Sequence, residues 1–313
     1  MRLENLNLFF RKEYEVVTMK YSGVGGQAVM EGIMMRNADK YAVAVRKPDK
    51  EIDVQVFPCK EYVKNKKVKE IPFIRGVFNF IDSLYLGMTS LLHSAEFAED
   101  EEEMDVEKEK EMLGWTVVLA VVMSLGLFFV VPYLISLIFQ SFIQSSFVIT
   151  LLEGIVRLAI FIGYVSLVAF MPEIKRTYMY HGAEHKCINC IEHGLELNVE
   201  NVRNSSKEHK RCGTSFLFLV ILISIVFFMF IKVDSGILKL IIRLALIPVI
   251  AGVSYEVIRI AGRYDNWFVN LISAPGLLMQ RITTLEPDDD MIEVGIASVE
   301  AVFDWKKWQE ENL

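Results

Sequence analysis

The sequence predicts a mainly α-helical, polytopic membrane protein with four transmembrane helices and a small cytosolic N-terminal part that contains a β-hairpin. Mean hydropathy is +0.34 over 313 residues, and the apolar residues are concentrated in long runs that are almost free of charge. Positive hydropathy over this length is typical of membrane proteins. A hydrophobic content of 53% excludes a disordered chain, and only 4 cysteines exclude a disulfide-rich scaffold.

Four apolar runs predict the four spans, because one transmembrane helix needs roughly 20 apolar residues. We place the spans at 114–138, 147–171, 214–231 and 237–258. The polar segment 140–146 separates the first two, and a short turn at 232–236 separates the last two. Buried core helices are the alternative, which the length and uniform apolar character of the runs disfavour.

The distribution of lysine and arginine predicts the orientation in the membrane. The loop 172–212 contains seven of these residues, whereas the turn 139–146 has none and the turn 232–236 has one. Because positive charge is enriched on the cytoplasmic side, we expect the N-terminal part, this middle loop and the C-terminal tail to be cytoplasmic. We therefore expect a multi-pass membrane protein with cytoplasmic termini and reduced cysteines.

The net charge of −7 comes from one tract. Residues 96–111 contain ten acids and two lysines, so the remainder of the chain carries about +1. The chain therefore has no overall basic character, and we expect no nucleic-acid partner. The lipid bilayer is the partner that the composition predicts.

These boundaries divide the chain into seven parts. They are an N-terminal extension (1–18), a cytosolic β-rich part (19–70), an amphipathic or interfacial helix with the acidic tract (71–111), transmembrane helices 1–2 (112–171), a cytosolic His/Cys loop (172–212), transmembrane helices 3–4 (213–261) and a cytosolic C-terminal tail (262–313).

Four local patterns predict the elements outside the spans. Segments 41–45 and 52–57 are rich in β-branched residues around a Pro48-Asp49-Lys50 turn, which predicts a hairpin. The glycine-rich segment 23–26 lacks a phosphate-binding lysine, so it predicts a tight backbone turn. Segment 71–97 predicts a helix starting at Pro72 that lies in the membrane interface, packs on the bundle or enters the bilayer. Acids at 286–290 fit an N-terminal cap for a final helix at 291–308.

The middle loop gathers most of the histidines and cysteines. His181 and His185 lie four residues apart, so on a helix they share one face, and Glu184 lies between them. Its position differs from that of the glutamate in the H-E-x-x-H motif. Thiolate and imidazole are zinc ligands, which predicts a metal site, with an ordinary polar loop as the alternative. Two of the candidate ligand sets are His181, His185, Cys190 and Cys212, or Cys187, Cys190, His209 and Cys212.

Charged residues inside the apolar runs form a second group of interest. Glu153 and Arg157 lie four residues apart in the second run and can pair on one helix face. Arg243, Glu256 and Arg259 lie in or at the end of the fourth. Such residues usually face the interior of a helix bundle. They either line a functional polar cavity or fix the bundle by pairing between helices.

Four motifs resemble those of the YqhQ-like family of bacterial membrane proteins. They are GGQAVMEGIMMR at 25–36, YHGAEHK at 180–186, RCGTSF at 211–216, and QRITT at 280–284 followed by EPDD at 286–289. The resemblance covers about residues 20–300 and implies a metal-dependent enzyme.

The resemblance also implies the residues to examine: His181, Glu184, His185 and Cys212, together with Glu31 and Arg36 from the first motif. Cys187 and His193 are less typical of the family pattern. This favours His181, His185, His209 and Cys212 as the ligands of a divalent metal, with zinc as the expected ion.

Two hypotheses of function follow. In the first, the protein is a membrane-associated metal-dependent hydrolase in which Glu184 or Glu31 is the general base. In the second, it is a non-catalytic partner of a membrane assembly, such as the Sec translocon or membrane-protein quality control, and any metal is structural. The sequence favours the second, because it contains no complete nucleophile–base or metal–base motif.

Overall fold

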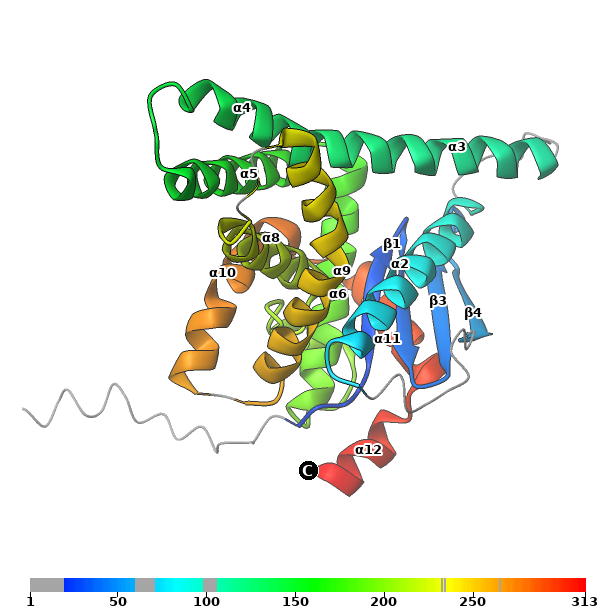
Figure 1. The fold of residues 1–313 in the computed structure, drawn as a ribbon. Coiled ribbons are helices and arrows are strands. Elements are labelled where there is room, and N and C mark those ends of the chain that lie inside the picture. The colour runs from blue at the N-terminus through cyan, green and yellow to red at the C-terminus, as the bar shows by residue number, and fades with distance from the viewer. Residues whose placement is uncertain (1–19, 60–70, 98–105, 232, 234, 265) are drawn as a thin grey trace, which may run out of the picture.

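The computed structural model describes residues 20–59, 71–97, 106–231, 233, 235–264 and 266–313. Most of the chain is helical, and one antiparallel sheet lies beside a group of long apolar helices (Figure 1). The predicted N-terminal extension (1–18) and residues 98–105 of the acidic tract lie outside the described residues.

The sheet has four strands in the order β1-β2-β3-β4, all antiparallel. Strands β3 (Lys40–Arg46) and β4 (Ile52–Pro58) confirm the predicted hairpin. Strands β1 (Gly25–Val29) and β2 (Gly32–Asn37) add a second hairpin that the sequence did not predict. The predicted turn at 23–26 is confined to its first residue, Gly23 (φ +79°), because Gly25 and Gly26 pair with β2.

Both faces of the sheet are buried. Side chains alternate across a strand, so Ile33 and Met35 of β2 face helices α6 (Pro172–Glu192) and α11 (Asp289–Val302). Met34 faces the opposite side, where it packs in one cluster with Leu86 of helix α2 (Ile74–Ala95). The sheet therefore lies between α2 and the α6–α11 pair.

Three helical segments are long and apolar enough to cross a membrane, which supports a membrane protein. They are Gly114–Phe139, Ser146–Val168 (α5) and Gly236–Ala261 (α9). The first comprises α3 (Val106–Leu125), the π-helix η2 (Gly126–Val130) and α4 (Val131–Phe139). The third predicted run forms a shorter apolar helix of 17 residues, α8 (Gly213–Met229).

The region predicted as a cytosolic loop, 172–212, is largely helical. It contains α6 and the short helix α7 (Val199–Asn204). Pro172 near the start of α6 and Glu173 in its first turn both favour helix initiation. The second half of α6 is buried, so tertiary packing stabilises a polar sequence as a helix.

The C-terminal tail contains α10 (Trp267–Thr283), α11 and α12 (Trp305–Asn312). The single final helix predicted at 291–308 is therefore two helices. The predicted acidic cap is confirmed, because the Asp288 side chain accepts a hydrogen bond from the backbone N–H of Met291. Helix α2 begins at Ile74, two residues later than predicted, because Phe73 adopts a positive φ of 66°.

Buried charges connect the apolar helices. Glu153 of α5 accepts hydrogen bonds through one oxygen from Arg157 (2.8 Å) and from Arg243 of α9 (2.6 Å). Arg157 also donates to the carbonyl of Phe128 in η2 and to Ser224 of α8. The predicted Glu153–Arg157 pair is confirmed. Glu153 also pairs with Arg243, so the ion pairs connect α5 with α9.

Helix α2 crosses α9 closely through two glycines, and this contact yields a prediction. A Cβ at Gly76 would lie 2.8 Å from Cβ of Tyr255 and 2.9 Å from Cα of Gly252. Gly76→Ala is therefore expected to destabilise the protein by about 1–3 kcal/mol through overpacking. Thermal unfolding in detergent micelles measures the effect.

The matched control is Gly163→Ala in α5, where an added Cβ meets nothing within 4 Å. This substitution should be neutral or stabilising by up to about 1 kcal/mol, because alanine has the higher helix propensity. Equal unfolding temperatures for the two variants would contradict the close crossing.

Candidate metal centre

Helix α6 presents His181 and His185 on one face, one turn apart. Their ring centroids are 4.4 Å apart. Between them, Gly182 lies against the carbonyl oxygen of Leu285, and a Cβ there would overlap that atom. The glycine therefore allows the segment after α10 to approach the two histidines closely.

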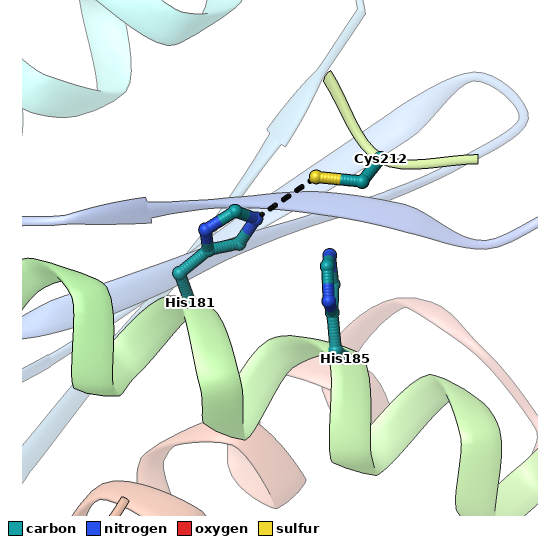
Figure 2. A group of neighbouring side chains, drawn as sticks. All are labelled: His181, His185 and Cys212. Atoms are coloured by element: carbon teal, nitrogen blue, oxygen red, sulfur yellow. Dashed lines mark hydrogen bonds between the residues drawn. The ribbon is translucent and has the colours of Figure 1, made fainter. Parts of the chain in front are cut away.

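Cys212 provides a third candidate ligand from a distant part of the chain. It is the N-cap of α8, and its Sγ lies 3.2 Å from Nε2 of His181. One ligand atom from each of His181, His185 and Cys212 lies within 4.8 Å of the others. Figure 2 shows the thiol and the two imidazoles converging from α6 and the start of α8.

Backbone carbonyls orient both imidazoles. Nδ1 of His181 is 2.8 Å from the carbonyl oxygen of Thr283, and Nδ1 of His185 is 2.6 Å from that of Lys207. A carbonyl oxygen can only accept, so each Nδ1 carries the proton and each neutral ring leaves a lone pair on Nε2. This arrangement is typical of metal-ligating histidines.

The electrostatics of the cluster favour a thiolate. Burial alone would raise the pKa of Cys212, but the positive charges on His181 and His185 outweigh it and hold that pKa well below its usual range. Burial would lower the pKa of His181, but the charges of Cys212 and Glu184 raise it to about 9. A divalent cation would bind the same thiolate and take the place of the His181 proton.

Glu184 lies beside the three ligands. One of its oxygens accepts a hydrogen bond from the backbone N–H of Gly26 in β1 (3.1 Å), and the other is 3.9 Å from Nε2 of His181. Burial raises the pKa of this carboxyl. The order His-x-x-Glu-His is the inverse of H-E-x-x-H and occurs in metallopeptidases. This order indicates a catalytic position for Glu184, which a comparison with the H-E-x-x-H motif alone does not detect.

The three ligands and Glu184 line a cavity of about 670 Å³. Its other walls come from β1, α2, the first turn of α8 and the last turns of α9. Arg36, which the first motif implied, and Arg211 also line this cavity. A volume of this size lies in the range of ligand pockets.

His209 lies next to the three ligands but is engaged elsewhere. Its ring centroid is 5.6 Å from that of His185. Its Nε2 is 3.6 Å from Glu192, and its backbone N–H and carbonyl both bond the Gln280 side chain. Among the described residues, the group that could hold a metal contains His181, His185 and Cys212 and not His209.

The remaining candidates lie away from the ligands. Cys187 and Cys190 are buried in the core between α6, the sheet and α11. Glu31, at the β1–β2 turn, pairs with Arg176 through both oxygens at 2.5 Å. Glu31 does not line the cavity described above, so Glu184 is the carboxylate at the centre.

A buried charge network that the sequence did not indicate supports the centre. Glu192 accepts hydrogen bonds from Arg211 (2.5 Å) and from the backbone N–H of Ser22 (2.9 Å). Burial opposes ionisation of Glu192, but the nearby His209 imidazole and the charge of Arg211 outweigh it and lower its pKa to about 2.

Comparison with known proteins places this chain in a family. The family described as "Protein of unknown function (DUF1385)" matches residues 71–305. The uncharacterized protein YqhQ of Bacillus subtilis (strain 168) is 35% identical over 300 residues, which cover 92% of this chain and 94% of that protein. The chain belongs to this YqhQ-like family. No solved structure matches it.

In this YqhQ-like protein, the four motifs that carry the resemblance meet at the centre. The first contributes the backbone N–H of Gly26, and the second contributes both histidine ligands and Glu184. The third contributes Cys212, and the fourth contributes the Thr283 carbonyl. Segments far apart in the sequence thus form one site.

The lowered pKa of Cys212 predicts that this thiol is reactive in chelator-treated protein. Iodoacetamide should alkylate Cys212 at mildly acidic pH, because the thiolate is the nucleophile. Cys187 and Cys190 should not react, since burial raises both pKa values, that of Cys190 to about 11. Peptide mass spectrometry measures each site. Alkylation of Cys212 only near the ordinary thiol pKa of 9.0 would contradict the prediction.

Glu192→Gln is expected to destabilise the protein by about 3–5 kcal/mol at neutral pH, because it leaves the Arg211 charge without its buried partner. The folded pKa of Glu192 is lowered from 4.5 to about 2, so its stabilisation is complete above the ordinary value. The difference from the parent protein should therefore shrink as pH falls from about 4.5 to about 2. Urea unfolding measures both effects.

The control is Glu293→Gln. The Glu293 side chain is 50% exposed and forms an ion pair with Arg46. Exposed pairs contribute less than about 1 kcal/mol, so this variant should unfold like the parent protein. A Glu192→Gln variant that behaves like the control would show that the buried network is not stabilising.

Proposed function

We propose that this protein is a membrane-associated, metal-dependent hydrolase. His181, His185 and Cys212 would bind one divalent cation, and zinc suits this nitrogen and sulfur donor set. One observation carries the proposal: the three ligand atoms lie within 4.8 Å of one another on the wall of a large cavity, beside a buried carboxylate. Three protein ligands with a position left for water or substrate are typical of catalytic zinc, whereas structural zinc takes four.

The donor set fits a cation on chemical grounds. Both histidines use Nδ1 to donate to backbone carbonyls, which leaves Nε2 as the ligand atom. The Cys212 thiol favours its thiolate form even without a metal. A bound zinc ion would act as a Lewis acid and lower the pKa of water.

Glu184 would act as the general base. Burial raises the pKa of Glu184 toward neutral pH. A general base is most effective when its pKa is near the pH at which the enzyme works. Hydrolysis forms a bond from the oxygen of water to the acyl carbon or phosphorus and breaks the bond from that atom to its leaving group. Glu184 would take the proton from water and return it to the leaving group, so that the carboxylate is regenerated.

We also propose that α8 is the fourth span and that both termini are cytoplasmic. Helix α8 is apolar and has 17 residues, which at about 1.5 Å per residue approach the ~30 Å thickness of a bilayer core. Since α8 begins directly after Cys212, this topology would put the metal centre at the cytoplasmic surface.

The non-catalytic alternative, a partner of the Sec translocon or of membrane-protein quality control, stays a prediction. That hypothesis expects a structural metal with four ligands. A centre of three ligands beside a cavity favours the hydrolase instead.

Metal analysis of purified protein tests the centre. We expect about one metal ion per chain, lost in His185→Ala and in Cys212→Ala. Glu184→Gln should keep the metal but lower hydrolysis of p-nitrophenyl acyl and phosphate esters by about 10²–10⁴-fold, because only the base is removed.

Two histidine variants are controls. His193→Ala changes an exposed residue at the end of α6, and His209→Ala changes the histidine outside the ligand group; both should keep the metal. Folded parent protein without metal would refute the proposal. Loss of metal in His209→Ala would indicate a four-ligand site and favour a structural role.

A further inference from the structure

We infer that the substrate of this centre is a membrane lipid with an anionic headgroup, which enters the cavity from the bilayer. The inference rests on the proposed hydrolase and adds the class of molecule on which it acts. It draws on three features: the mixed polar and apolar lining of the cavity, the exposure of some of its apolar residues, and the arginines that line it.

The lining of the cavity combines polar and apolar groups. The three candidate ligands, Glu184, Arg36 and Arg211 are among its polar groups. Its apolar groups come mainly from three helices: Phe80 and Leu84 of α2, Phe216 and Leu217 of α8, and Tyr255 and Ile258 of α9. A molecule with a polar head and an apolar chain matches this lining, because it can contact groups of both kinds.

The apolar wall continues onto the surface that faces lipid in the proposed topology. Leu84 and Leu217 both line the cavity, yet they are 58% and 45% exposed. Leu217 lies in the first turns of α8, at the end that would meet the cytoplasmic headgroups. An acyl chain could therefore pass from the bilayer to the cavity along apolar side chains.

Helix α2 forms the rim of this entrance. Its exposed apolar residues recur every three, four or seven positions and make one stripe along the helix: Ile74, Ile81, Leu84, Tyr85, Met88 and Leu91. The opposite face packs on the sheet through Leu86 and on α9 through Gly76. An amphipathic helix with such a stripe lies in a membrane interface. The stripe would hold the cavity entrance at the depth of the lipid headgroups.

The two arginines that line the cavity suit an anion. Arg211 lines the cavity, and among the described residues its Nη1 is buried without a hydrogen-bond partner. The same guanidinium is held in place by Glu192 and stacks on Tyr21, 4.0 Å from the ring centroid. Arg36 lines the cavity from β2. Arginine forks bind phosphate and carboxylate groups well, which favours an anionic headgroup.

Photolabelling of the full-length protein tests the inference. The protein is reconstituted in phosphatidylcholine vesicles that contain a phosphatidylglycerol with a diazirine on its acyl chain, and labelled peptides are identified by mass spectrometry. We expect labels on the cavity walls formed by α2, α8 and α9. A phosphatidylcholine with the same diazirine should label these walls several-fold less, because it lacks a net negative charge.

Two substitutions one turn apart on α2 are the matched pair. Leu84→Trp would narrow the entrance and should lower cavity labelling several-fold. Met88→Trp changes the same stripe at a residue that does not line the cavity. In this variant the labelling of the cavity walls should persist. Equal cavity labelling in both variants would overturn entry past α2. Metal content, measured on the same samples, should be unchanged in both.

The outcomes separate the lipid from the metal. Cavity labelling without bound metal would support the lipid site and refute the hydrolase. Bound metal without cavity labelling would overturn the lipid assignment and direct the search to peptide substrates. Excess inorganic phosphate should leave the acyl label in place. If phosphate abolishes it, the arginines bind a soluble phosphate ester, and the lipid assignment is wrong.

Discussion

The close packing of helix α6 against its neighbours is the contact on which the candidate centre depends. Gly182 admits the Leu285 carbonyl, and Gly26 admits the Glu184 side chain, at positions where a Cβ would collide. This proximity lets the Thr283 carbonyl reach His181 and the Gly26 N–H reach Glu184. The groups that orient the imidazole and the carboxylate thus belong to the backbone, which is held by secondary structure and cannot rotate away as a side chain can.

Buried charges link the centre to the apolar helices. The Glu153–Arg157–Arg243 cluster joins α5 to α9, and Arg157 also bonds Ser224 of α8. Because Cys212 is the N-cap of α8, the placement of this helix also places the third ligand. A charge buried in apolar surroundings is costly unless it is paired, so these ion pairs restrict how the helices can pack. Two of these helices, α8 and α9, also line the cavity.

Several features could be predicted because their causes are local. The β3–β4 hairpin follows from β-branched residues around a turn, the Glu153–Arg157 pair from helical spacing, and the cap of α11 from adjacent acids. Strand β1 could not be predicted from the sequence, because its glycines have low β propensity and become extended only by pairing with β2. The helical state of 172–192 was also missed, since burial against the sheet stabilises it more than its own pattern does.

The sequence by itself determined that the chain has long apolar helices, because hydropathy acts over neighbouring residues. It also showed that His181 and His185 would share one face if their segment were helical. It also limited the third candidate ligand to a few histidines and cysteines. Only the tertiary structure distinguishes among these candidates. Cys212 approaches His181 while His209 is engaged by Glu192 and Gln280, and Cys187 and Cys190 are buried in the core. That choice depends on how α6, α8 and the sheet pack, and packing between distant segments has no local signature in a sequence.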